Sequence, residues 1–359
     1  MKVLLIKTSS LGDVIHTFPA VTDAAEQIPG IQFDWVVEKA FADVPQWHPA
    51  VDRVIPISLR NWRKGWGKAW KSGAIQVFIK QLRQTEYDLI IDAQGLLLKS
   101  GIIGLFAHGP RAGYDRKSAR DPWSALAYQH KYQVSRKLHA VERIRQLFAQ
   151  ALNYELGEDA EVNYGIRVGS ESQQEEKKPY LVFLHSTTWV TKHWPEPYWV
   201  ELASQAIASG YRVLWPWYTP DERLRAERLI AGSGGSLAPK GGLDSMAKLL
   251  SGADGVVGVD SGLAHLAAAL ERPSISLYGP TSTVLTGAVG PLQQNLSANY
   301  DCAPCLSRKC GKAAVPVRDL GPGSDNLPKE IYPPCFTTVN PQQVWSSLQQ
   351  QMAPGSGHE

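Results

Sequence analysis

Residues 255–270 (GVVGVDSGLAHLAAAL) join an apolar, β-branched run to the polar turn Asp260-Ser261-Gly262 and then to an Ala/Leu-rich stretch. This pattern predicts a buried strand, a turn and a buried helix. The first turn of such a helix leaves backbone N–H groups unpaired and carries the positive end of the helix dipole. The turn is therefore a candidate anion-binding site, and the alternative is an ordinary N-cap formed by Asp260 or Ser261.

A second candidate anion site follows the apolar run 180–184 (YLVFL). Thr187 and Thr188 lie in the polar segment after this run, and Lys192 follows four residues later. Two hydroxyls, nearby amides and a lysine are the groups needed to bind a diphosphate without a metal ion. Further along, Glu222 is placed to accept hydrogen bonds from a ribose diol. An exposed glutamate in the first turn of a helix is the alternative for Glu222.

The segment 7–13 (KTSSLGD) follows the first apolar run of the chain and ends in a carboxylate. It has neither the Gly-rich dinucleotide fingerprint nor the Walker lysine pattern. Asp13 has the chemistry of a general base acting on a substrate hydroxyl. The alternative is that Asp13 only stabilises the N-terminus of the following helix electrostatically.

Apolar runs of strand length alternate with helical stretches along the whole chain. Such runs occupy residues 2–7, 33–37, 54–56 and 89–92, and again 180–184, 211–215, 255–259 and 274–278. Alternation of this kind predicts a doubly wound α/β fold. Because 359 residues exceed the usual size of one core, we expect two Rossmann-like domains, residues 1–165 and 178–350, joined by a polar, charged connection.

Composition narrows the possible partners. A net charge of +3 is too small to argue for nucleic acid, and no stretch has the ~20 apolar residues of a membrane span. The N-terminal apolar run is too short for a signal peptide, so we expect a cytoplasmic location in which cysteines are not presumed to form disulfides.

Residues 59–84 are basic and tryptophan-rich, and we expect them to be helical. Trp62, Trp66 and Trp70 recur every four residues, so on one helix they would share a stripe flanked by Arg60, Arg63, Lys64 and other cations. Such a helix suits an anionic amphiphile or membrane surface. The alternative is an amphipathic helix that packs its tryptophans on the core. Residues 135–152 are also predicted to be helical, and His139 and Arg143, four residues apart, would share one face of that helix.

Several longer motifs resemble glycosyltransferase family 9, in particular its heptosyltransferase I group. The matching segments are KTSSLGDVIHTFPA, FDWVVE, IDAQGLLLKS and HAVER, followed in the second half by FLHSTTWVTKHWP, GVDSGLAHLAAAL and YGPT. The resemblance covers residues 1–285. It implies the GT-B fold, in which two Rossmann-like domains face a central cleft. It also implies transfer of L-glycero-D-manno-heptose from ADP-heptose to the Kdo of Kdo-lipid A, with inversion.

The resemblance also implies residue roles. Asp13 would be the general base and Lys192 would assist the leaving group. The implied donor-binding residues are Thr187, Thr188, Lys192, Glu222, Asp260, Ser261, Gly262 and His265. The candidate acceptor-binding residues are Ser10, Arg60, Arg63, Lys64, Arg120, His139 and Arg143. No cofactor is expected besides the donor ADP-heptose, because there is no paired-acid motif for a metal. The expected partners are Kdo-lipid A and the anionic cytoplasmic face of the inner membrane.

The cysteines depart from the heptosyltransferase I pattern. Cys302, Cys305, Cys310 and Cys335 are closer to the pattern of heptosyltransferase II, which adds its heptose to a heptose of the core. Four thiols with one CxxC pair could hold a structural zinc ion, and reduced thiols or local disulfides are the alternatives. Two other functions remain open: a sugar-nucleotide epimerase of GT-B type and a non-catalytic nucleotide-sugar-binding module.

Overall fold

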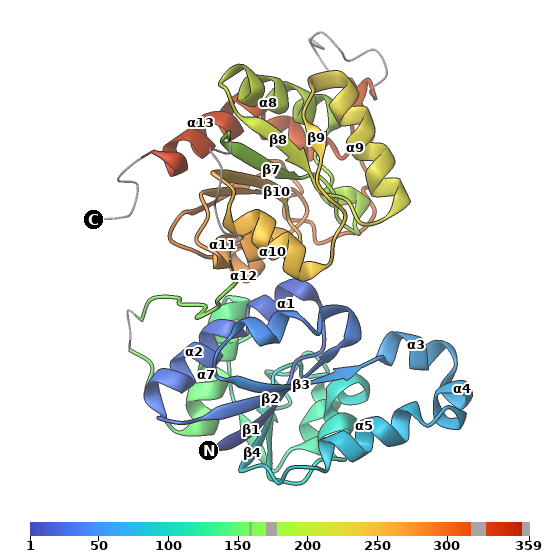
Figure 1. The fold of residues 1–359 in the computed structure, drawn as a ribbon, viewed down its shortest axis with the longest axis vertical. Helices are drawn as coiled ribbons and strands as arrows, with labels where there is room; N and C mark the ends of the chain where they lie inside the picture. Colours follow the sequence, from blue (N-terminus) through green and yellow to red (C-terminus); the bar gives the residue numbers. More distant parts are fainter. Residues whose placement is uncertain (158–159, 170–177, 317–327, 354–359) are drawn as a thin grey trace. The chain divides into compact units, whose positions relative to one another are not determined.

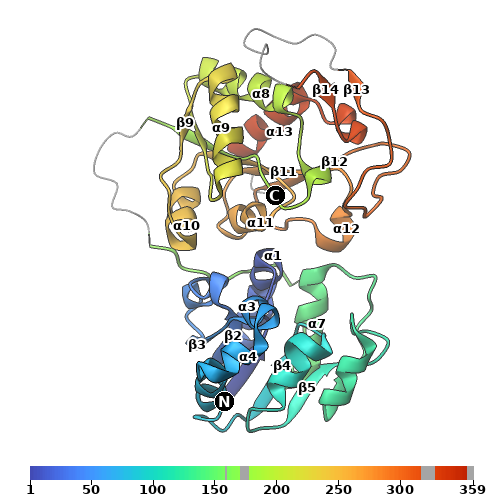
Figure 2. The ribbon, with the colours of Figure 1, turned by 90° about the vertical axis from the view of Figure 1, so that its right-hand side faces the viewer.

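Each half of the chain folds around one six-stranded parallel sheet. The structure, a computed structural model, describes residues 1–157, 160–169, 178–316 and 328–353. The chain divides into residues 1–167, here called unit 1, and residues 168–359, here called unit 2. Figures 1 and 2 show two views of them. No helix within the described ranges is both long and apolar enough to cross a membrane.

The sheet of unit 1 has the strand order β3-β2-β1-β4-β5-β6, and every neighbouring pair is parallel. Its inner strands are buried apolar runs, as expected of a parallel sheet covered on both faces. The strands are β1 (Lys2–Ile6), β2 (Gln32–Glu38), β3 (Val51–Ile57), β4 (Leu89–Asp92), β5 (Arg111–Tyr114) and β6 (His130–Tyr132).

Helices cover both faces of this sheet (Figure 1). On one face α2 and α7 pack together, and Phe18 and Phe148 contact the rings of Trp35 and Phe33. The other face carries α3, α4, α5 and α6, whose apolar side chains join one core cluster with Ile6 and Ile90. The helices are α1 (Leu11–Ile15), α2 (Phe18–Gln27), α3 (Leu59–Lys64), α4 (Trp66–Lys71), α5 (Ala74–Leu82), α6 (Ile102–Gly104) and α7 (Ala140–Leu152).

Unit 2 repeats this plan with the order β12-β11-β10-β7-β8-β9, again parallel throughout. Four tryptophans dominate its core, and Trp194, Trp199 and Trp215 are fully buried beneath α8 and α9. The strands are β7 (Tyr180–Leu184), β8 (Arg212–Trp215), β9 (Ser236–Leu237), β10 (Gly255–Val259), β11 (Ser274–Tyr278) and β12 (Gln293–Ser297), with a separate antiparallel pair, β13 (Val315–Pro316) and β14 (Glu330–Ile331).

The helices of unit 2 form two layers (Figure 2). One layer contains α8, α9 and α13, which pack on each other, and the other contains α10 and α11. Their bounds are α8 (Glu196–Ala208), α9 (Pro220–Ser233), α10 (Leu243–Ser251), α11 (Gly262–Ala269), α12 (Thr283–Thr286) and α13 (Pro341–Met352).

Counted from its own first strand, each unit has the order 3-2-1-4-5-6. This is the Rossmann order, in which the chain direction across the sheet reverses between the first and fourth strands. Ligands of open α/β sheets bind at the carboxyl ends of the strands beside that reversal. The loops after β1 and β4 in unit 1, and after β7 and β10 in unit 2, are therefore where a site is expected.

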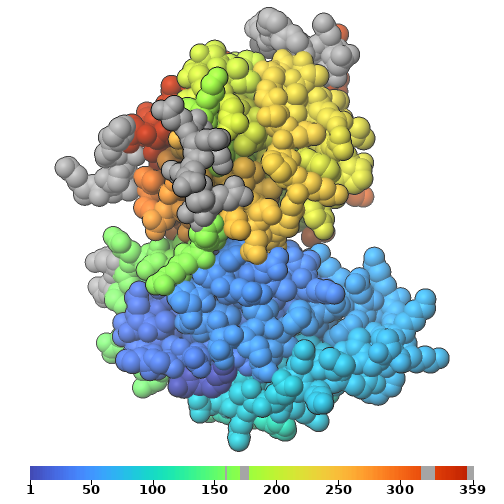
Figure 3. Space-filling view, viewed as in Figure 1, coloured from blue at the N-terminus to red at the C-terminus, as the bar shows by residue number. Residues whose placement is uncertain are grey.

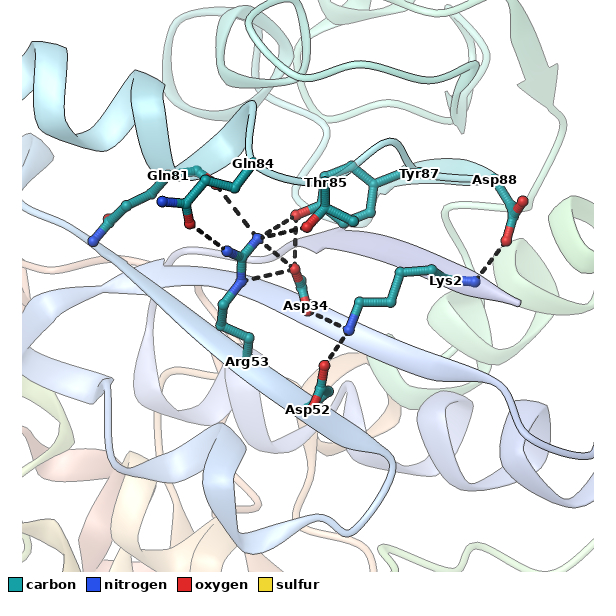
Figure 4. A network of polar contacts seen from close by, with 9 residues as sticks. All are labelled: Lys2, Asp34, Asp52, Arg53, Gln81, Gln84, Thr85, Tyr87 and Asp88. Carbon is teal, nitrogen blue, oxygen red and sulfur yellow. Dashed lines mark hydrogen bonds and ion pairs between the residues drawn. The ribbon is translucent and has the colours of Figure 1, made fainter.

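A buried ionic network lies at the opposite, amino-terminal end of the sheet in unit 1 (Figure 4). The Asp34 side chain is fully buried, 2.8 Å from Lys2 Nζ and 2.6 Å from Arg53 Nη2. The Tyr87 hydroxyl donates to Asp34 Oδ2 at 2.8 Å, and Lys2 also pairs with Asp52. Because these groups come from β1, β2, β3 and the entry to β4, they fix the strands on the side away from the loops.

Two helix predictions from the sequence were wrong. The tryptophan-rich stretch is not one helix, because it breaks at Gly65 and again at Gly73, whose φ of +75° favours glycine. The helix predicted to begin at residue 135 begins at Ala140 instead, with His139 as its N-cap. His139 and Arg143 still lie one turn apart at the start of α7, because the Arg143 backbone N donates to the His139 carbonyl at 2.9 Å.

Candidate active site

In unit 1 the loop after β1 is held by the turn after β4. Oε1 of Gln94 accepts hydrogen bonds from the backbone N of Thr8 at 3.0 Å and of Ser9 at 3.2 Å. The turn itself is shaped by buried Asp92, whose Oδ1 accepts from the N–H groups of Gln94 and Gly95 at 2.8 and 3.1 Å. The loop that leads to Asp13 is thus fixed by a second strand end beside the reversal of the sheet.

Asp13 lies in the first turn of α1 and is partly exposed. Its Oδ2 accepts hydrogen bonds from Ser10 N at 2.6 Å and from Ser10 Oγ at 2.9 Å. This is the helix-end role that the sequence offered as the alternative to catalysis. Both bonds go to one carboxylate oxygen, so the contact orients the group and is compatible with a base. Ser10, predicted to bind the acceptor, is bonded to Asp13 here.

Positive charge gathers around this loop. Buried Lys7 donates from Nζ to Ala93 O at 2.9 Å. Burial lowers the pKa of Lys7, while Asp13 and Asp92 oppose that shift and Arg143 and Arg120 reinforce it. All four charged groups are therefore near the Lys7 ammonium. Asp13, Arg120 and Arg143, which the sequence put forward, are thus all close enough to act on Lys7, and sequence reasoning missed Lys7, Asp92 and Gln94.

Arg143 and His139 are both fixed by their own unit. Arg143 donates from Nη2 to Ser118 O at 2.8 Å, and its guanidinium stacks over the Tyr114 ring at 5.1 Å. Nδ1 of His139 accepts from Val141 N at 3.2 Å. The His139 ring also meets the His16 ring with centroids 5.7 Å apart. His139 thus has a helix-capping role in addition to any contact with a substrate.

The predicted tryptophan stripe does not exist as one surface. Trp62 is buried in the core, with only 9% exposed, whereas Trp66 and Trp70 on α4 are 58% and 54% exposed. Because the chain breaks at Gly65, α3 and α4 do not form one continuous helix. The core-packing alternative therefore applies to Trp62, and the exposed-surface alternative applies to Trp66 and Trp70. Arg60, Arg63 and Lys64 on α3 are exposed.

In unit 2 the turn after β10 forms a compact cluster around Asp260. Lys192 Nζ lies 2.7 Å from Oδ2, Thr281 Oγ1 donates to the same oxygen at 2.5 Å, and His265 Nε2 is 3.8 Å from Oδ1. Burial opposes ionisation of Asp260, but His265 and Lys192 outweigh it and lower its pKa to about 2. Asp260 is therefore a fixed anion that holds a cation at the amino end of α11.

Ser261 is the N-cap of α11, and its Oγ accepts from Ala264 N at 3.4 Å. The N-cap alternative is thus confirmed for Ser261, and the helix start at Gly262 remains beside Lys192. Thr187 follows β7, and its carbonyl contacts His193 Nε2 at 2.8 Å. Thr188 is exposed. The loops after β7 and β10 therefore supply one strand-end cluster, in which Lys192 lies beside Asp260.

A pocket of about 140 Å³ adjoins the end of β7. One part of its lining follows β8 and contains Pro216, Trp217 and Tyr218. Another part comes from α10 and α11 and contains Leu243, Met246 and Leu263. The remaining lining residues are Leu184, His185, Ser186, Glu222, Gly241 and Gly242. Its apolar walls are suited to an aromatic base. Sequence reasoning found Glu222 but missed these walls, although Pro-Trp-Tyr directly after a strand was a usable signal.

Glu222 Oε2 accepts from the backbone N of Tyr218 at 2.8 Å and of Thr219 at 2.9 Å. With the Thr219 side chain it forms a capping box at the start of α9. Glu222 therefore has a structural role and also lines the pocket. Beside the Asp260 cluster, the Trp189 ring lies under two cations, Lys192 at 4.6 Å and Arg308 at 4.7 Å.

The four cysteines line one small cavity of about 20 Å³ together with Tyr300, Pro280 and Lys312. All four are free thiols, so the disulfide alternative does not apply in this structure. Burial and the three other cysteines raise the pKa of Cys335 to about 11. Within the described ranges, however, no group of three or more His, Cys, Asp or Glu side chains is arranged to hold a metal ion. The zinc site considered from the sequence stays a prediction, because the four thiols line one cavity without being arranged as a metal-ligand group within those ranges.

Comparisons with known proteins agree with this geometry. Lipopolysaccharide heptosyltransferase 1 of Pseudomonas aeruginosa is 50% identical to this chain over 350 residues, which cover 97% of each chain. Lipopolysaccharide heptosyltransferase 1 of Escherichia coli K12 is 45% identical, over 82% of this chain and 92% of its own length. The solved structure of E. coli heptosyltransferase WaaC with ADP matches with a TM-score of 0.82 and 39% identity, over 98% of this chain and 100% of that one.

The predicted α/β GT-B class is confirmed by this full-length match and by the two parallel sheets. The E. coli heptosyltransferase II structure, 19% identical with a TM-score of 0.71, shares the fold. The model of glycosyltransferase family 9 (heptosyltransferase) matches residues 75–315, which is more than half of the chain. With half its residues identical to a heptosyltransferase 1 along nearly the entire length, this chain belongs to glycosyltransferase family 9.

Proposed function

We propose that this protein transfers L-glycero-D-manno-heptose from ADP-heptose to the Kdo of Kdo-lipid A in lipopolysaccharide inner-core synthesis. The observation that carries the proposal is the strand-end cluster of unit 2, where a lysine, a helix start and an apolar pocket lie next to each other. A diphosphate and an adenosine need these three features side by side. The matched relatives are heptosyltransferases 1, and WaaC has been solved with ADP and with an ADP-2-deoxy-2-fluoro heptose.

In this proposal unit 2 binds the donor. The adenine lies between Trp217 and Met246, Glu222 accepts from the ribose through Oε1, and the diphosphate meets Lys192 and the amides at Ser261 and Gly262. Thr187 and Thr188 contribute hydroxyls. Asp260 and His265 act through Lys192 and the turn, because Asp260 is buried and already paired.

Unit 1 is proposed to bind the acceptor. Asp13, oriented by Ser10, removes the proton of the Kdo hydroxyl while that oxygen attacks the anomeric carbon of the heptose. The bond from that carbon to the ADP oxygen breaks on the opposite face, which gives inversion in one step. Lys192 and the helix start stabilise the negative charge of the leaving ADP. Arg60, Arg63, Lys64, Arg120, His139 and Arg143 are the candidate contacts to acceptor phosphates and carboxylates. No step requires a metal ion.

The experiment measures transfer from ADP-heptose to purified Kdo-lipid A by wild type, Asp13→Asn and the matched control Glu26→Gln, an exposed acid on α2. We expect Asp13→Asn to lower kcat by about 10³-fold, the size of a lost general base, with ADP affinity unchanged. The control should behave as wild type. Turnover of Asp13→Asn within a few-fold of wild type would reject Asp13 as the base.

The cysteine cluster favours a second acceptor. The CxxC pattern is closer to that of heptosyltransferase II, so a heptosylated Kdo-lipid A is the competing acceptor. Running both acceptors side by side decides between them. Turnover of ADP-heptose without any acceptor would instead support an epimerase. We further propose that the protein works at the cytoplasmic face of the inner membrane, where its lipid acceptor lies.

A further inference from the structure

Exposed apolar side chains concentrate on one layer of unit 1. Of the sixteen large hydrophobic residues that are exposed within the described ranges, nine lie between residues 66 and 126. Leu98, Ile102, Leu105 and Phe106 follow each other along the π-helical turn Leu97–Gly101 and α6, and Leu98 is 77% exposed. Trp66 and Trp70 are one turn apart on α4. The six in unit 2 are scattered over residues 190–332.

These segments share one layer, which we call the α3–α6 face. Ile103 of α6 joins the same core cluster as Trp62 of α3 and Phe78 of α5, so the three helices cover one face of the sheet. Arg83, just after α5, donates from Nε to the carbonyl of Phe106 at 3.1 Å. The turn Pro122–Ala127, which carries exposed Trp123 and Leu126, packs on the turn Leu97–Gly101.

The exposure is a property of the outer side of these helices only. Around α6, Ile103 and Ser100 are buried while Leu98, Ile102 and Leu105, at spacings of four and three, are exposed. Around α4, Ala69 is buried while Trp66 and Trp70 are exposed. The inner side of this layer is apolar and packs on the core. Because its outer side is apolar as well, we expect the outer side to contact an apolar environment too.

The same face is strongly basic. Residues 59–85 contain seven of the 37 lysines and arginines and none of the 34 acidic residues, so that the rest of the chain has a net charge of −4 against +3 for the whole. Lys64, Lys68, Lys71 and Lys80 are exposed. In Figure 3 this segment, light blue to cyan, lies at the surface of unit 1. Indoles and leucines bordered by lysines match the interface of an anionic bilayer, where apolar groups enter and ammonium groups meet phosphates.

We propose that the α3–α6 face docks on an anionic lipid bilayer. Its leucines and tryptophans enter the headgroup boundary and its lysines lie at the level of the lipid phosphates. The inference builds on the proposed function, because a lipid-anchored acceptor is reached only by an enzyme at the bilayer surface. It assigns to α4, α5 and α6 a task separate from the chemistry at Asp13.

The test is co-sedimentation of the full-length protein with vesicles of phosphatidylcholine alone or mixed equally with phosphatidylglycerol. We expect binding to the mixed vesicles only, weakening as salt rises. The double variant Lys68→Glu/Lys71→Glu should lose on the order of thirtyfold in affinity, since each lysine contributes about fivefold at such a surface. Leu98→Ser/Leu105→Ser should lose about tenfold through the apolar part. Neither pair belongs to the residues assigned to catalysis or substrate binding.

Matched controls in unit 2 are Leu224→Ser/Val284→Ser and Lys248→Glu/Lys309→Glu, which alter equally exposed side chains. They should bind as wild type does. Transfer to a deacylated, water-soluble acceptor should be unchanged in every variant, whereas transfer to vesicle-bound acceptor should fall with vesicle binding. If the wild-type protein transferred no heptose to the soluble acceptor, that result would instead refute the proposed function.

Three results would overturn the docking proposal. The first is equal vesicle binding by wild type and both face variants, and the second is binding that ignores lipid charge. The third is a wild-type dimer in light scattering that the Leu98→Ser/Leu105→Ser variant converts to a monomer, which would make the face a contact between protein copies.

Discussion

Asp92 and Asp260 hold the same place in the two units, at the end of the fourth strand beside the reversal of the sheet, yet their surroundings are opposite. Asp92 is bonded to neutral groups, the N–H groups of Gln94 and Gly95 and the Tyr128 hydroxyl at 2.5 Å. Burial dominates there and raises its pKa. Asp260 faces Lys192 and His265, and its pKa falls to about 2. The same strand order thus places one carboxylate among neutral hydrogen-bond donors and the other beside cations.

The difference indicates how the two units divide the work. In unit 1 the strand-end carboxylate shapes a turn, and the turn fixes the loop that carries Asp13. The Asp13 carboxylate is oriented by the neutral backbone N and hydroxyl of Ser10, while the Lys7 ammonium acts on it from nearby. In unit 2 the carboxylate itself is bound to a cation, and so the strand end holds a positive group ready for an anion.

The largest effect should come from removing the cation-bound carboxylate. Asp260→Ala leaves the half-buried Lys192 beside no anion, which costs about 3 kcal/mol in the free energy of unfolding. Asp92→Ala should cost less, about 1–2 kcal/mol, because it deletes only neutral hydrogen bonds. Urea titration of both variants measures this, and ADP should restore part of the loss in Asp260→Ala by pairing with Lys192. Equal losses without rescue by ADP would contradict the distinction.

The next effect tests the loop of unit 1. Gln94→Ala removes the acceptor of the Thr8 and Ser9 amides, so Asp13 loses its fixed position and kcat should fall about tenfold. Gln94→Glu keeps an oxygen in the same place and should recover most of kcat. ADP affinity, measured by calorimetry, should be unchanged in both, because Gln94 belongs to unit 1. A fall in ADP affinity equal to the fall in kcat would mean that Gln94 has another role.

The third effect concerns pH. His193 contacts Thr187 and Arg225 in the donor cluster, and burial, then the Arg225 charge, lowers its pKa to about 4 from 6.5. Below pH 6.5 the unfolded chain gains a proton on this residue and the folded chain does not, so stability falls as the pH drops from 6.5 to 4. The slope from one such group is about 1 kcal/mol per pH unit. His193→Gln should remove that contribution from the stability curve, and an unchanged slope would show that the pKa of His193 is the same in the folded and the unfolded chain.

The sequence predicted the parts of this structure that depend on local pattern. Parallel strands such as β7 and β10 are short apolar runs, and the Asp260 turn follows from the run before it and the alanines after it. The breaks at Gly65 and Gly73 were harder to place, because flanking tryptophans and lysines favour continued helix and only tertiary packing decides which tryptophan is buried. Residues 135–138 likewise have helical neighbours but lie before the N-cap His139.

Contacts between distant residues could not be predicted. Gln94 meets Thr8 across 86 positions, and Lys192 meets Asp260 across 68, because sheet order rather than sequence spacing brings strand ends together. The pocket walls at Trp217 and Met246 depend on the paths of two loops in the same way. The candidate residues were therefore found where a motif was local, and their partners were missed where the partner came from another strand.

The contact between Lys192 and Asp260 also bears on the end of each reaction cycle. A lysine that waited alone in a buried site would hold a spent nucleotide tightly, since its departure would strand an unbalanced charge. Here the Asp260 carboxylate, 2.7 Å from Lys192 Nζ, pairs with the ammonium again as the phosphates leave. The site without nucleotide therefore holds no uncompensated charge, and release of ADP before the next donor binds becomes easier.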